Sequence, residues 1–312
     1  MRITAIIVAL NEAPFIGAAV SAIYPFVDKI FIQTGYDRSW NNQRVLPDGT
    51  VEKLLSLPDP QGKIALLIRR LPDEALTRNL LMRMDGYDLH HRHRNTVGMQ
   101  REVELFCERA DYFWIIDGDE IYDPRTIGSL LEYLKAKAPK VMYVRGVSYF
   151  RTWNYVVEPS DNFFQPGFVK PGIVFQENRN LEVASYWRLL FNKYTRKLGA
   201  LSIEKRLQEL GGITWAPEDL AVFHHAAYVG DDARIQKKIQ LSVHNKDMMT
   251  TWFEDVWRKW TPGARNLHPV HPSNFAGLKY IPTADLPPII KDTQWPEGFI
   301  ESANPAMQWS AN

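Results

Sequence analysis

The chain has 312 residues, of which 45% are hydrophobic and 23% charged, and this is enough to bury a sizeable core. The 37 Lys and Arg residues balance 36 Asp and Glu residues, and the net charge of +1 excludes a global attraction to nucleic acid or anionic lipid. No apolar run approaches the roughly 18 residues that a membrane span needs. The single cysteine, Cys107, excludes an intramolecular disulfide and a multi-cysteine zinc site. Because Asn11, Glu12 and Pro14 interrupt the N-terminal apolar run, we expect no signal peptide and a cytoplasmic protein, free or peripheral to the membrane.

The N-terminal region alternates strand patterns with a helix pattern. Residues 3–10 are a continuous apolar run, which is typical of a strand buried on both faces. Asn11 is placed to cap a helix, and further strands are predicted at 27–33 and 63–71. The helix has its apolar residues at helical spacing, at Ile16, Ala19, Val20 and Ile23. This order predicts an α/β fold with a doubly wound, mostly parallel sheet flanked by helices.

The pattern weakens over residues 72–94, which we interpret as a long polar excursion. A helix is predicted from Asn95, and it leads to a strand at 112–116. Asp123 followed by Pro124 is a typical helix start. The apolar face of that next helix is Ile127, Leu130, Leu131 and Leu134.

Later strands are predicted at 141–149, 186–194 and 220–224, with an irregular, aromatic-rich loop at 150–171. A helix should follow Asp231 and Asp232, and another should pack a tryptophan-rich face in the core, with Trp252, Trp257 and Trp260. Prolines recur after Thr261 and predict an extended tail. We expect a domain at 1–240, with halves at about 1–125 and 126–240, and a helical and extended segment at 241–312.

The sharpest chemical pattern is Asp117-Gly118-Asp119, at the carboxyl end of an apolar strand and followed by Glu120. Ligands of open α/β sheets bind outside such strand ends. Carboxylate oxygens suit Mg²⁺ or Mn²⁺, which in turn would hold a diphosphate. The pattern alone is weak, because paired aspartates also occur in solvated turns, but its position after a buried strand favours a metal site.

Together with this motif, the run Ile6-Ile7-Val8-Ala9-Leu10-Asn11-Glu12 and the pair His224-His225 before a capped helix resemble the inverting GT-A glycosyltransferases of family 2. The likeness extends over about the first 240 residues in order and spacing. Gln100-Arg101 leading through Ala110-Asp111 to the strand resembles the bacterial subgroup whose motif ends in D-x-D-E. The resemblance implies a GT-A, Rossmann-like fold, a nucleotide-diphosphate sugar as donor, with a UDP-sugar expected, and Mn²⁺ or Mg²⁺ as cofactor.

The resemblance also implies roles for single residues. Glu12 would lie against the nucleoside, and Asp117, Gly118 and Asp119 would grip the ribose and, through the metal, the diphosphate. Asp37 is the one residue after the second strand that fits the aspartate pair of the family, which leaves the identity of the donor's nucleobase open. The alternative for Glu12 is a first-turn acid favoured by the helix dipole.

Arg101 is a candidate for the donor phosphates, and its alternative is a surface salt bridge on its own helix. His224 and His225 are neighbours on a strand and face opposite sides, so only one can face a metal, and we take His224. Glu204 matches the acid of a His-Glu pair in the subgroup and is the candidate base, although Ile203 replaces the histidine. A surface role for Glu204 stays open, as do two other acids, Glu218 and Asp219.

Residues 90–94, His-His-Arg-His-Arg, could bind zinc, phosphate or an anionic acceptor, or form a solvated loop. Any nucleic-acid contact would have to come from this segment, between His90 and Arg94. A group of aromatic residues with no periodic face could stack on an acceptor, and Trp153→Ala would then lose acceptor turnover but not donor binding. This group is Trp153, Tyr155, Phe163 and Phe164.

We therefore predict a metal-dependent inverting glycosyltransferase whose acceptor, a glycan, lipid, protein, nucleic acid or small molecule, is open. A nucleotidyltransferase is the first alternative, but no glycine precedes Gly17 to form a phosphate loop after the first strand. A non-catalytic protein that binds a sugar nucleotide or an anionic polymer is the second.

Overall fold

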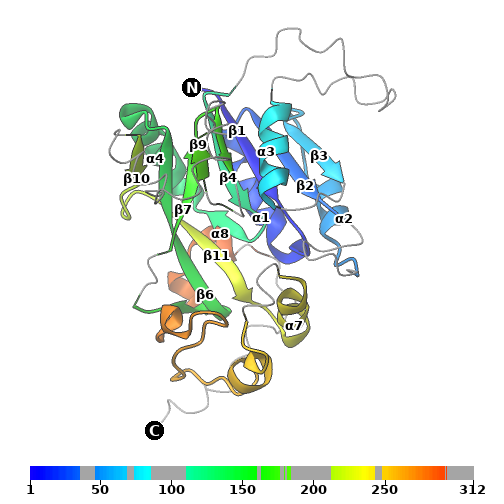
Figure 1. The fold of residues 1–312 in the computed structure, drawn as a ribbon, viewed down its shortest axis with the longest axis vertical. Coiled ribbons are helices and arrows are strands. Elements are labelled where there is room, and N and C mark those ends of the chain that lie inside the picture. Colours follow the sequence, from blue (N-terminus) through cyan, green and yellow to red (C-terminus); the bar gives the residue numbers. More distant parts are fainter. Residues whose placement is uncertain are drawn as a thin grey trace, which may run out of the picture.

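The structure is a computed structural model, and it describes residues 1–35, 46–68, 74–85, 110–159, 163–175, 179, 181–183, 212–242, 248–291 and 293. These residues form a mixed ten-stranded sheet with helices on both faces, in the order β3-β2-β1-β4-β7-β6-β11-β5 (Figure 1). β10 and β12 also pair with β6, and β8 pairs with β9 in a second sheet. The predicted α/β class with a mostly parallel sheet flanked by helices is confirmed.

The parallel half of the sheet is centred on β1 (Ile3–Val8), whose residues are all buried. β1 pairs in parallel with β2 (Lys29–Thr34) on one side and with β4 (Tyr112–Asp117) on the other, and β3 (Ile64–Ile68) lies outside β2. The chain thus winds outward from β1 to β3 and returns to the opposite side of β1 at β4. A crevice opens where the winding reverses, between the carboxyl ends of β1 and β4, and this is where such sheets bind ligands.

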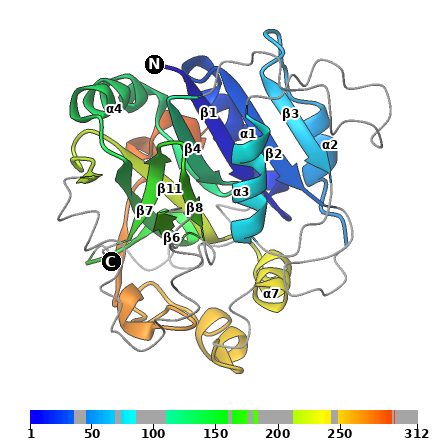
Figure 2. The same cartoon turned by 45° about the horizontal axis from the view of Figure 1, so that its top comes forward.

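Helices cover both faces of this half. α1 (Ala13–Ile23) and α4 (Pro124–Lys137) pack on one face, and α3 (Glu74–Met84) packs on the other (Figure 2). α2 (Thr50–Leu55) lies beside α1, and a 3-10 turn (Tyr24–Phe26) links α1 to β2. The predicted apolar positions of α1 are all buried: Ile16, Ala19, Val20 and Ile23.

Two local predictions in this half are wrong. The cap position of α1 is Glu12, with no side-chain cap, because Asn11 adopts a left-handed backbone with φ 59°. The polar excursion predicted over 72–94 contains α3. The charged residues of this helix lower its mean hydropathy, although one of them, Arg78, is buried. The helix predicted from Asn95 and the strand predicted at 186–194 lie outside the described residues.

The second half of the sheet is built around β6 (Val141–Val157), which is twice as long as predicted. β7 (Phe164–Val169) pairs with it, so the loop predicted at 150–171 is wrong. Trp153 is 2% exposed and lies edge-on to Phe15 at 5.9 Å and to Tyr149 at 4.9 Å between ring centroids. Trp153 and Tyr155 are therefore core residues of β6, and the predicted acceptor platform loses both.

The remaining elements complete the sheet and a second small core. Asp231 caps α7 as predicted, and its carboxylate accepts a hydrogen bond of 2.8 Å from the backbone of Arg234. Trp252 and Trp257 are buried against Phe150, as the prediction of core packing required. The elements are β5 (Glu120–Tyr122), β8 (Ile173–Phe175), β9 (Leu181–Val183), β10 (Ile213–Trp215), β11 (Val222–Val229), α7 (Asp232–Leu241), a π-helical turn (Phe253–Trp257), 3-10 turns (Pro272–Phe275 and Thr283–Asp285), β12 (Leu278–Tyr280) and α8 (Pro288–Lys291).

Among the helices that the structure describes, none is long and apolar enough to cross a membrane. The predicted boundary near residue 240 stays a prediction. Residues on both sides of it, Ile235 in α7 and Trp252, share the small core with the distal part of β6.

Candidate functional site

A cavity of about 860 Å³ opens at the carboxyl ends of β1 and β4, a volume within the range of small-molecule sites. Its walls come from the turn after β1, the turn after β4, the start of β7 and α7, at residues 10–14, 117–120, 163–166 and 233–242. Glu12, Asp117, Gly118 and Asp119 all line it. The crevice predicted by the winding of the sheet is therefore the place where the predicted acids meet.

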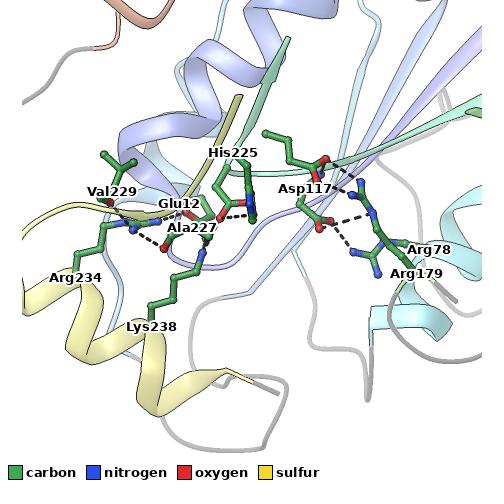
Figure 3. A network of polar contacts seen from close by, with 11 residues as sticks. Glu12, Arg78, Asp117, Arg179, His225, Ala227, Val229, Arg234 and Lys238 are labelled. Carbon is green, nitrogen blue, oxygen red and sulfur yellow. Dashed lines mark hydrogen bonds and ion pairs between the residues drawn. The ribbon is translucent and has the colours of Figure 1, made fainter. Parts of the chain in front are cut away.

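α7 sends two cations toward these acids from one face. The Lys238 ammonium lies 2.6 Å from Asp119 Oδ2 and 3.2 Å from Glu12 Oε1 (Figure 3). Arg234, one turn earlier, donates to Glu12 Oε2 at 2.9 Å and to the carbonyl of Val229 at 2.6 Å. Burial alone would raise the pKa of Asp119, but Lys238, His225 and Arg234 together outweigh it and hold that pKa well below its usual value.

A second charged group surrounds Asp117. Arg78 of α3 donates to Asp117 Oδ1 at 2.6 Å, and Arg179 Nε lies 3.8 Å from Asp117 Oδ2. Arg179 also binds both carboxylate oxygens of Glu120, at 2.6 and 2.9 Å, and the carbonyl of Ile115 at 3.0 Å. Figure 3 shows these arginines approaching from the side opposite α7. Each acid of the motif is thus paired with a cation of the chain itself.

The structure places His225, and not His224, at the cavity. His225 Nε2 lies 3.9 Å from Asp119 Oδ2, and its ring stacks on Phe163 with 5.0 Å between centroids. His224 points to the other side of β11, where its Nδ1 forms a 2.9 Å hydrogen bond with the Tyr149 hydroxyl. The assignment of His224 as the inward histidine is therefore corrected. Because successive side chains of a strand point to opposite faces, one histidine of the pair had to face inward, but this rule does not determine which one.

His224 should make the stability of the fold depend on pH. Burial lowers the pKa of His224 from 6.5 to about 4. Between these two pH values the imidazole is protonated in the unfolded chain and neutral in the folded protein. The stability contributed by neutral His224 is complete above pH 6.5 and is lost as the pH falls toward 4. Between pH 7 and pH 5 we expect the wild type to lose about 2 kcal/mol more unfolding free energy than His224→Gln. Urea unfolding at both pH values measures this, and equal losses in the two proteins would contradict it.

The predicted metal ligands do not gather around one point. An ammonium group lies on Asp119 Oδ2, and a guanidinium group lies on Asp117 Oδ1. In the part of the chain that the structure describes, no group of three or more His, Cys, Asp or Glu side chains is placed to hold a metal ion. The residues as arranged do not fit a divalent cation, because a chain cation already compensates each of the two aspartates and no third ligand of the described residues is grouped with them.

Several predicted residues lie outside the described ranges: Asp37, Arg101, Glu204 and the basic cluster from His90 to Arg94. The alternative bases are away from the cavity, since Asp219 is exposed and Glu218 pairs with Arg145 at the surface. Phe163 and Phe164 do line the cavity, whereas Trp153 and Tyr155, the other two residues of the predicted acceptor platform, do not.

Sequence reasoning missed the four cations of the site: Arg78, Arg179, Arg234 and Lys238. One signal was available for the last two. Arg234 and Lys238 are four residues apart on a capped helix that directly follows the histidine strand, so they share a face toward its end. No comparable pattern marks Arg78 or Arg179.

No model of a known protein family matches the sequence, and no curated protein matches it. Residues 1–349 of TarS from S. aureus are similar in structure, with a TM-score of 0.36 and 10% identity over 73% of this chain and 61% of that one. The same TarS fragment in complex with UDP-GlcNAc gives 0.38 and 10% over 74% and 59%. Glucosyl-3-phosphoglycerate synthase from Mycobacterium tuberculosis, in complex with Mn²⁺, UDP and phosphoglyceric acid, gives 0.28 and 16% over 47% and 43%. The chain spans about three-fifths of the TarS fragment, and likenesses this weak do not bear on its chemistry.

Proposed function

We propose that this protein is a glycosyltransferase that moves a sugar from a nucleotide-diphosphate sugar, with a UDP-sugar as the expected donor, to an acceptor by direct displacement. One observation carries the proposal: Glu12 and the Asp117-Gly118-Asp119 turn meet chain cations in one cavity at the reversal of the sheet. A sugar nucleotide offers hydroxyl groups for carboxylates and a diphosphate for cations. The family resemblance of the motifs points to the same class.

The side chains suggest a division of work. Asp117, held by Arg78 and Arg179, can accept hydrogen bonds from ribose hydroxyls. Glu12 lines the same cavity and would lie against the nucleoside. Phe163 and Phe164 offer apolar surface in the same cavity. The cavity is therefore mixed in character, as a donor with a base, a sugar and charged phosphates requires.

In the displacement, the acceptor oxygen forms a bond to the anomeric carbon while the bond from that carbon to the diphosphate oxygen breaks. The electron pair of the breaking bond leaves with the diphosphate, whose growing charge faces the cations. The acceptor proton passes to a carboxylate base, for which Glu204 stays the prediction. A single displacement inverts the configuration at the anomeric carbon. The metal dependence expected from the sequence is not part of this proposal, because Lys238 and Arg78 already bind the acids that would hold the metal.

Nucleotide binding tests the proposal. We expect UDP and UDP-sugars to raise the melting temperature, since a ligand at 100 times its Kd adds about 2.7 kcal/mol to the stability of the folded state. Asp117→Asn keeps the size of the side chain but loses the charged acceptor, and should weaken UDP binding by about ten- to a hundred-fold. Glu132→Gln, on the exposed face of α4, is the matched control and should behave as wild type.

Thermal shift over a panel of nucleoside diphosphates and their sugars is the first measurement, and calorimetry of the best ligand is the second. A flat response of the folded protein to every nucleotide would refute the donor site. That result would favour the non-catalytic protein that binds an anionic polymer.

A further inference from the structure

We propose that the ammonium group of Lys238 takes the place of a divalent cation in this site, bridging Asp119 and the diphosphate of the donor. The inference rests on the proposed function and deepens it, because it says how this chain would hold its donor. It also replaces the metal dependence that the sequence led us to expect.

The position of Lys238 is the first support. Its Nζ lies between the acids of the two turns, at 2.6 Å from Asp119 Oδ2 and 3.2 Å from Glu12 Oε1. These acids lie in the turns that follow β1 and β4, so the ammonium group lies at the α7 side of the crevice (Figure 3). A metal ion that joins an aspartate to a diphosphate would have to stand at this end of the crevice, next to Asp119.

The donor capacity of Lys238 is the second support. An ammonium group has three N–H donors, and the contacts to Asp119 and Glu12 use two of them. The Lys238 side chain is 30% exposed and lines the cavity, so its remaining donor is available to a phosphate oxygen there. Burial would lower the pKa of Lys238, but the Asp119 and Glu12 carboxylates outweigh it and raise that pKa, so the amine stays protonated at neutral pH.

Arg234 holds Glu12 in place and does not offer its own charge to the ligand. Its guanidinium group donates to Glu12 Oε2 at 2.9 Å and to the carbonyl of Val229 at 2.6 Å, so its donors point into the protein. Its side chain is 13% exposed, against 30% for Lys238. Arg234 therefore acts as a positioning residue that holds Glu12 and the first turns of α7, while Lys238 offers its charge to the ligand.

Competition for Asp119 is the third support. A divalent cation bound to Asp119 would lie close to the Lys238 ammonium group, which is 2.6 Å from Asp119 Oδ2, and the two positive charges would repel each other. Metal binding at Asp119 thus competes with the ammonium group of Lys238. The other acid of the motif is no easier, since Arg78, with a side chain 1% exposed, holds Asp117 at 2.6 Å.

The experiment measures UDP binding by calorimetry in EDTA and in Mn²⁺, for wild type, Lys238→Met and Lys135→Met. Lys135 is exposed on α4 and controls for the loss of a lysine. We expect wild type and Lys135→Met to bind UDP within about two-fold in the two buffers. Lys238→Met should bind about ten- to a hundred-fold more weakly than wild type in EDTA, the size of one charge-assisted hydrogen bond. Mn²⁺ should restore part of the loss, because Asp119 is then free.

A second readout does not involve the nucleotide. Free Mn²⁺, followed by its electron paramagnetic resonance signal, should not bind tightly to wild type in the cavity but should bind more tightly to Lys238→Met. If Lys238→Met does not fold, the wild-type comparison of EDTA with Mn²⁺ decides alone.

Wild type that binds UDP only with Mn²⁺ would overturn the inference and leave the proposed function standing. Lys238→Met that binds UDP in EDTA as tightly as wild type would overturn it as well. No binding of UDP or of any other nucleoside diphosphate in either buffer would overturn the proposed function, and the inference with it.

Discussion

Arg179→Met is expected to lower the free energy of unfolding by about 3–5 kcal/mol, the cost of leaving a buried charge without its partner. The Glu120 side chain is 1% exposed, and the Arg179 guanidinium binds both of its carboxylate oxygens, at 2.6 and 2.9 Å. Removing the guanidinium would leave this carboxylate in the core beside Asp117, whose backbone N–H donates to Glu120 Oε2 at 3.0 Å. Urea unfolding at pH 7 measures the loss.

The paired variants separate the charge effect from the loss of packing. Arg179→Met combined with Glu120→Gln leaves no uncompensated charge and should recover a large part of the lost stability. Arg125→Met is the surface control, because Arg125 pairs with Asp123 while its own side chain is 66% exposed, and this variant should change stability little. Equal effects of Arg179→Met and Arg125→Met would show that the Arg179 pair adds nothing.

The place of the site could be predicted because it depends on local patterns and on one rule of sheet topology. A continuous apolar run marks a buried strand, and the acids that end two such runs, at Glu12 and Asp117, meet if the strands are neighbours and parallel. The structure has β1 and β4 paired in this way. Only the residue types, and not their partners, were needed for that step.

The partners of those acids could not be predicted, because they come from distant parts of the chain. Lys238 lies 119 residues from Asp119, and Arg179 lies 59 residues from Glu120. A charged residue on an amphipathic helix or in a polar stretch looks like a solvated one until the packing is known. The metal expected at Asp117 and Asp119 followed from the acids alone and stays a prediction, and the cations beside these acids could not be included in it.

The length of β6 was missed for a related reason. Trp153 packs against Phe15 and Tyr155 packs against Trp260, and all four residues of 152–155 are buried, so this part of β6 shows no alternation between buried and exposed positions. Without a period, an aromatic-rich strand resembles an irregular loop. The same irregularity suggested an acceptor platform where the chain has a core.

Gly118→Ala is expected to weaken UDP binding by about ten- to a hundred-fold and to cost about 1–3 kcal/mol of stability, because the turn has no room for a side chain. A Cβ atom at Gly118 would lie 2.8 Å from the Cβ of Ala9 and 3.2 Å from the Cβ and Cγ of Glu12. The Gly118 backbone N–H also donates to the carbonyl of Val8 at 2.9 Å, which holds the ends of β1 and β4 together. The added methyl group must therefore push the two strand ends apart, and it moves Asp117 and Asp119 away from Glu12 and Lys238.

Gly128→Ala is the matched control, because a Cβ atom at Gly128 meets nothing within 4 Å on the exposed face of α4. This variant should gain about 1 kcal/mol of helix stability and bind UDP as wild type does. Calorimetry with UDP and urea unfolding test both variants, and a Gly118→Ala protein that binds UDP like wild type would mean that the donor does not use the crevice between β1 and β4.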